Sequence, residues 1–140
     1  MGKINLQRVV LGGLLAGLVL NVVDFVTYGV VLGDQMNAAM RALGKPEIGS
    51  SAIAWFVTVD FLYGIALVWA YAAIRPRFGV GPRTAVYAGL FVWVAIGLLH
   101  ALSEMPMGLF PQGLVMTGTL VALVALPVAA VVGATVYTEA

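Results

Sequence analysis

VVLGGLLAGLVLNVVDFVTYGVVL, residues 9–32, indicates the fold class, because it is an almost unbroken apolar stretch. A helix needs about 20 mostly apolar residues to cross the hydrocarbon core of a bilayer. Three further stretches meet this requirement, at residues 52–74, 85–103 and 114–137. We therefore predict an all-α integral membrane four-helix bundle that forms a single transmembrane domain over residues 1–140.

The composition supports a membrane protein. The chain is 62% hydrophobic and 9% charged, whereas a soluble domain is about 25% charged. So few charged side chains cannot cover a soluble globule, which excludes a soluble enzyme. Nucleic-acid binding would need clustered lysines and arginines. The expected partner is the lipid bilayer, with no nucleic acid.

Residue types that carry common chemistries are scarce. The chain has no cysteine and one histidine, which removes disulfides, zinc–thiolate sites, iron–sulfur ligands and bis-histidine haem within one chain. It also shows no glycine-rich phosphate loop and no serine–histidine–acid spacing. We assign no catalytic residues, do not favour an enzyme, and leave the cofactor unknown.

The orientation follows from the basic residues in the short connections. Five of them fall on one side of the predicted membrane, namely Lys3, Arg8, Arg75, Arg77 and Arg83, and two on the other, Arg41 and Lys45. Cytoplasmic loops carry the excess of Lys and Arg. We therefore expect both termini to be cytoplasmic in a multi-pass protein of the cell inner membrane.

Two connections show capping signals. Asp34 is expected to be the N-cap of a short helix through Leu43, with Gly44 just beyond its end. The apolar face of this helix would lie flat on the bilayer, and a plain loop is the alternative. Thr84 is expected to cap the third spanning helix.

Ionisable residues inside the spans are the candidate site. Counted from the cytoplasmic arginines at 1.5 Å per residue, Asp24, Asp60 and His100 lie at about 24, 22 and 25 Å. Glu104 lies one turn beyond His100 on the same face. Three helices thus place ionisable groups in one layer of the outer half of the membrane.

Glycines mark the packing faces of the same helices. One stripe of the first span contains Gly13, Gly17, Asn21, Asp24 and Tyr28, and one stripe of the third contains Gly89, Trp93, Gly97, His100 and Glu104. Small residues allow close approach of helix backbones in membranes. The polar groups are therefore expected to face the bundle interior.

Three interpretations of this cluster stay open. It is a structural network that holds the helices together; or it binds a ligand, ion or proton; or it binds a metal. The residues of the ligand- or proton-binding site would be Asp24, Asp60, His100, Glu104, Asn21, Tyr28 and Tyr63. Any metal would be held by Asp24, Asp60, His100 and Glu104.

The function hypotheses follow these interpretations. The first is a membrane protein that binds or transports a small molecule, ion or proton. The alternative is a non-catalytic accessory subunit of a larger membrane complex, and the third is a metal-dependent membrane enzyme. Because so short a chain encloses little volume, a transport path would form in a homo-oligomer or a larger assembly.

Two segments carry a resemblance to known proteins. Residues 29–35 with 38–44, GVVLGDQ and AAMRALG, and residues 71–79, YAAIRPRFG, resemble uncharacterised small four-span membrane proteins of bacteria. The resemblance covers most of the chain and implies a bacterial inner-membrane location. It implies no activity and no site residues.

Overall fold

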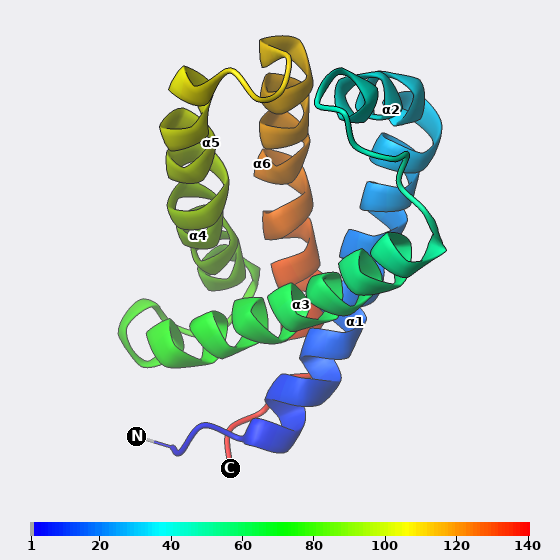
Figure 1. Cartoon of the computed structure of the whole chain (residues 1–140). Coiled ribbons are helices and arrows are strands. Elements are labelled where there is room, and N and C mark those ends of the chain that lie inside the picture. The colour runs from blue at the N-terminus through cyan, green and yellow to red at the C-terminus, as the bar shows by residue number, and fades with distance from the viewer. Residues whose placement is uncertain (1) are drawn as a thin grey trace.

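A computed structural model describes residues 2–140, which form helices and connecting loops (Figure 1). Four continuous helical segments are long and apolar enough to cross a membrane, which confirms the prediction of four long apolar helices. Their bounds are Leu6–Val31, Ser50–Phe78, Pro82–Met107 and Gln112–Ala134. The third is longer than expected, and the fourth ends three residues before the predicted Tyr137.

Two of the four spans change their helical type along their length. The first is α1 (Leu6–Asp24) followed by a π-helical segment, η1 (Phe25–Val31). The third is α4 (Pro82–Val92), then a π-helical segment, η2 (Trp93–Leu98), then α5 (Leu99–Glu104) and a 3-10 turn, η3 (Met105–Met107). The second span is α3 (Ser50–Phe78) and the fourth is α6 (Gln112–Ala134). The chain connects η1 to α3 through the short α2 (Gly33–Ala42).

Glycines set the crossing of α1 and α3, the most extensive helix pair. A methyl group on Gly13 would lie 2.5 Å from the Ile65 Cα, and one on Gly17 would lie 2.7 Å from the Phe61 Cα. A methyl group on Gly64 would collide with the Gly13 carbonyl oxygen. The predicted glycine stripe of the first span is therefore a close helix contact, as small residues allow in membrane bundles.

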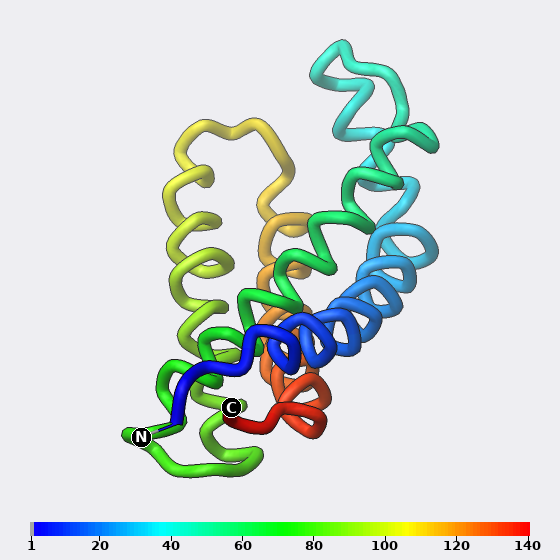
Figure 2. The backbone as a smooth tube through the Cα atoms, turned by 90° about the horizontal axis from the view of Figure 1, so that it is seen from below, coloured from blue at the N-terminus to red at the C-terminus, as the bar shows by residue number. Residues whose placement is uncertain are grey.

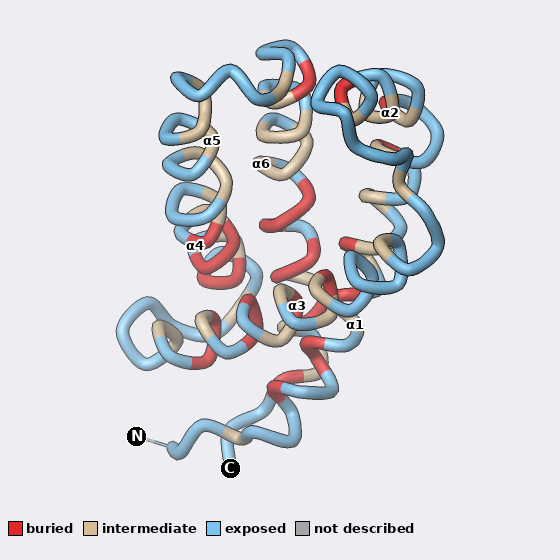
Figure 3. The backbone as a smooth tube through the Cα atoms, in the orientation of Figure 1, coloured by how far each residue is buried: buried red, intermediate tan, exposed pale blue. Residues whose placement is uncertain are grey.

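The main core lies where α1, α3, α4 and α6 cross (Figure 3). Gly12 approaches Gly133 of α6, and Gly89 of α4 approaches Pro127 of α6. Beyond this crossing the helices diverge, and a smaller cluster of Leu32, Ala39 and Leu114 joins α2 to the start of α6. The bundle is thus closed at one end and more open at the other.

Both termini lie at the closed end, beside the turn that joins α3 to α4 (Figures 1 and 2). The Ala140 amide donates to the Lys3 carbonyl at 3.2 Å. The buried Tyr137 ring packs edge-on against Tyr71 and lies under the Arg75 guanidinium, 5.4 Å from its centroid. The two termini and the α3–α4 turn therefore lie at the same end of the structure, as expected.

Details of the connections differ from the expectations. Helix α2 begins at Gly33, so Asp34 stands in its first turn and is not its N-cap. Gly44 follows the helix with a φ of 67°, as expected for a glycine beyond a helix end. Part of the apolar face of α2 packs against the bundle, because Ala39 is buried and Met36 contacts the smaller cluster.

The cap of the third span is also different. Helix α4 starts after Gly81 with Pro82 in its first turn. The Thr84 hydroxyl donates to the Gly79 carbonyl at 2.7 Å, so it holds the preceding turn and does not cap the helix. The reason is that Pro82, which is well suited to the first helical position, starts the helix two residues before Thr84.

Candidate functional site

The first pair of ionisable residues sits at the α1–α3 crossing. Asp24 ends α1, and Asp60 lies in α3 one turn before Gly64. The two carboxyl groups are near enough to interact across this crossing. Asp60 is buried, at 8% exposed, and Asp24 is half-buried. We call Asp24 and Asp60 the carboxyl pair.

Asn21 continues this interface one turn toward the core. Its side-chain amide donates to the Gly17 carbonyl at 2.9 Å and to the Val57 carbonyl of α3 at 3.4 Å. The stripe predicted from glycine and polar spacing therefore faces α3 from Gly13 to Asn21, whereas its last member, Tyr28, contacts α6. The close backbone approach at Gly17 and Gly64 is what brings the two carboxyl groups into reach of one another.

The carboxyl pair has no cationic partner among residues 2–140. The ion pairs in this part of the chain are Arg41–Glu47, exposed in the α2–α3 connection, and His100–Glu104. Two carboxylates in contact repel, and a hydrogen bond between them requires a proton on one of them. Two carboxyl groups so placed, without a basic partner, are best accommodated by one shared proton.

The second pair lies on the third span. The His100 Nε2 is 3.3 Å from a Glu104 carboxylate oxygen, one helical turn away. The His100 side chain is largely exposed, at 63%, and the Glu104 side chain is partly exposed, at 44%. No hydrogen bond or ion pair in residues 2–140 joins His100 or Glu104 to the carboxyl pair.

The predicted single cluster is therefore two separate pairs. The described residues contain no group of three or more His, Cys, Asp and Glu side chains that could hold a metal. The metal set of Asp24, Asp60, His100 and Glu104 is thus not assembled. The physical reason is that equal depth fixes only the position of a residue along its own helix. The distance between helices depends on how they pack, and here α6 packs against both α1 and α4.

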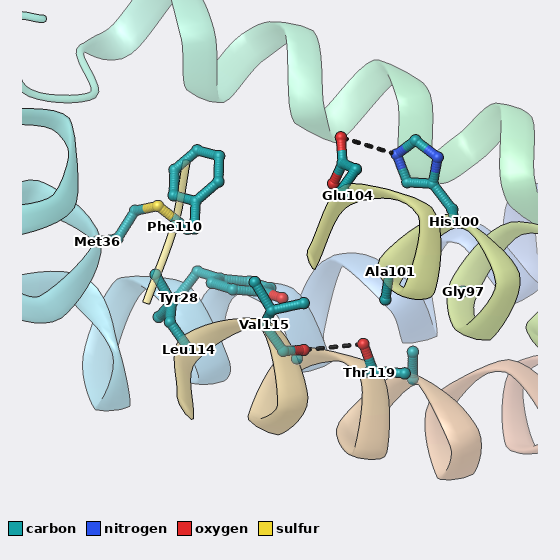
Figure 4. A pocket seen from close by; sticks show the side chains of 12 residues that line it. Tyr28, Met36, Gly97, His100, Ala101, Glu104, Phe110, Leu114, Val115 and Thr119 are labelled. Carbon is teal, nitrogen blue, oxygen red and sulfur yellow. Dashed lines mark hydrogen bonds and ion pairs between the residues drawn. The ribbon is translucent and has the colours of Figure 1, made fainter. Parts of the chain in front are cut away.

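Tyr28 lies between the two pairs. It is half-buried in η1, one turn from Asp24, and its hydroxyl contacts Gly118 of α6 so closely that a methyl group on this glycine would collide with it. Tyr28 also lines an open-sided groove together with His100 and Glu104 (Figure 4). Tyr63, by contrast, packs against the main core.

The groove was not predicted from the sequence. It has a volume of about 260 Å³ and lies between η1 and α2 on one side and η2 and α5 on the other, with α6 as its floor. Its lining is Tyr28, Met36, Gly97, His100, Ala101, Glu104, Phe110, Leu114, Val115, Gly118, Thr119 and Ala122. Three of these residues, Tyr28, His100 and Glu104, were predicted to bind a ligand, whereas the rest of the lining was not.

Both walls of the groove contain a π-helical segment. One follows Asp24 directly, and the other contains Gly97 of the groove lining. π-Helical turns are rare and occur often at functional sites. At η2 the Trp93 Nε1 donates to the Thr119 carbonyl at 2.8 Å, which ties this wall to the floor.

Comparison with protein-family models, with curated proteins and with solved structures gives no match for this chain.

Proposed function

We propose that the chain is a proton-binding transport protein of a bacterial inner membrane, with both termini cytoplasmic. The observation that carries this proposal is the carboxyl pair, two acids from different helices in contact without a basic partner. Intramembrane carboxyl groups are the usual proton relays of pumps and transporters. A shared proton that can leave and return makes this pair a proton-binding site.

The arrangement of the pair suits proton exchange. Asp60 is buried on α3, whereas Asp24 is half-buried and precedes the π-helical segment that leads to the groove. A proton could therefore enter from the Asp24 side, where Tyr28 provides a hydroxyl one turn away. Glycine contacts at the crossing hold the two helices at a fixed separation.

Proton flux into liposomes tests the proposal. The purified protein is reconstituted with an internal pH-sensitive dye, and a potassium gradient with valinomycin drives proton entry. We expect flux above that of empty liposomes, and a loss of at least about tenfold in Asp24→Asn and in Asp60→Asn. An asparagine amide still donates a hydrogen bond to the remaining carboxylate, but it carries no exchangeable acid proton.

The matched control is Thr58→Ala, an exposed change two residues from Asp60 on the same helix, where the hydroxyl bonds only to its own helix. It should leave the flux unchanged. Wild-type flux equal to that of empty liposomes would contradict the proposal. If the asparagine variants instead melt at a much lower temperature, the pair is structural and the accessory-subunit hypothesis is favoured.

A further inference from the structure

The groove has a distinct polar end and a distinct apolar end (Figure 4). Glu104 and His100 stand on the α5 wall, and Met36, Phe110 and Leu114 gather near α2 and the start of α6. Pockets for small molecules are mostly apolar with a few polar groups that fix orientation. The groove has this distribution of side chains.

The groove is lined by one acidic side chain and by no lysine or arginine. Glu104 is the only lining residue with a formal charge at neutral pH, apart from the titratable His100, and no lysine or arginine lines the groove. The nearest basic side chain on α2, Arg41, is paired with Glu47. An anionic ligand would therefore find no lysine or arginine there, whereas a cation would find a carboxylate.

Aromatic rings line the same groove. Tyr28 lies in η1 and Phe110 in the loop before α6, and both pack against the cluster of Leu32, Ala39 and Leu114. The face of an aromatic ring attracts a cation when the cation lies within about 6 Å of the ring centre. Such rings also accept the apolar body of an organic ligand, which a hydrated metal ion lacks.

We propose that this groove binds a small organic cation with an aromatic or aliphatic body. Its positive group pairs with Glu104, and its apolar body lies against Phe110, Leu114 and Val115. The ligand takes the place of His100 as the partner of Glu104, which the exposure of the imidazole permits because it is free to turn away. This inference does not depend on the carboxyl pair.

Calorimetric titration of the protein in lipid nanodiscs tests the inference, with empty nanodiscs as the blank. The probes are phenyltrimethylammonium and benzenesulfonate, two single-ring ions of opposite charge and similar shape. We expect the cation to bind and the anion not to bind. Glu104→Gln should weaken cation binding about tenfold or more, because the charge attraction between the carboxylate and the quaternary ammonium group is lost.

Three further variants sharpen the test. Ala122→Phe fills the groove beside α6 and should abolish binding, with a melting curve to confirm that the variant is folded. Glu47→Gln removes an exposed acid outside the groove and should bind as the wild type does. Asp60→Asn should also bind normally, which separates this inference from the proton-binding function.

Several results would overturn the inference. Equal binding of both probes would show that charge does not select the ligand. Absence of cation binding to the wild type, or unchanged affinity in Glu104→Gln, would show that Glu104 and the groove do not form a cation site.

Discussion

Asp60 is the only acidic or basic residue among residues 2–140 that the structure buries, and its carboxyl group meets that of Asp24. A buried polar group that loses its partner costs about 1–3 kcal/mol, whereas replacing both partners by apolar groups can be nearly neutral. The energetic role of the carboxyl pair can therefore be separated from its chemistry by single and double substitutions.

We expect Asp60→Leu to lower the free energy of unfolding by about 1–3 kcal/mol, because it leaves Asp24 without its partner inside the bundle. The double variant Asp24→Leu/Asp60→Leu should regain most of this loss. Reversible unfolding in mixed micelles, followed by circular dichroism, measures both. A double variant that loses the sum of the two single effects would show that the carboxyl groups do not interact.

At the scale of the element, the crossing of α1 and α3 depends on Gly64. An added methyl group there would meet the Gly13 carbonyl and the Gly17 backbone, which belong to another helix and cannot turn away. We expect Gly64→Ala to lower the free energy of unfolding by about 1–3 kcal/mol, the usual cost of overpacking. The measurement is again unfolding in micelles.

Gly113 in the first turn of α6 is the matched control, because a methyl group there meets nothing within 4 Å. Gly113→Ala should leave stability unchanged or raise it slightly, since alanine favours helix. Equal effects of the two substitutions would show that the α1–α3 crossing is not a close glycine contact.

The elements show what periodicity can and cannot predict. Hydropathy predicted all four long helices, and four-residue glycine spacing identified the face of α1 that meets α3. It did not predict η1 and η2, because π-helical segments are rare and share the composition of α-helices. Nor did it place Asp34 or Thr84, because α2 begins at Gly33 and α4 at Pro82, before the residues that were expected to cap them.

At the scale of the whole molecule, the candidate site was predicted in part. Asp24 and Asp60 do meet, because their faces and their depths both agree. His100 has the same depth but belongs to a helix that contacts α6, so it faces the groove with Glu104 and Tyr28. Lateral position in a bundle depends on helix crossing, which one sequence does not reveal.

The orientation is testable because the chain has no native cysteine. A single cysteine at Lys45 lies in the α2–α3 connection, and one at Val80 lies in the exposed α3–α4 turn at the opposite end. In intact cells, a membrane-impermeant maleimide should label Lys45→Cys and should label Val80→Cys only after the cells are opened. The reverse pattern would show that the termini are outside.

The central claim is that the carboxyl pair holds one proton, and infrared difference spectroscopy tests it most directly. The wild-type protein at neutral pH should show the C=O stretch of a protonated carboxyl group. This band should disappear in both Asp24→Asn and Asp60→Asn and persist in Glu104→Gln. A wild-type spectrum without a protonated carboxyl band, or a band that survives in Asp24→Asn and Asp60→Asn, would contradict the account.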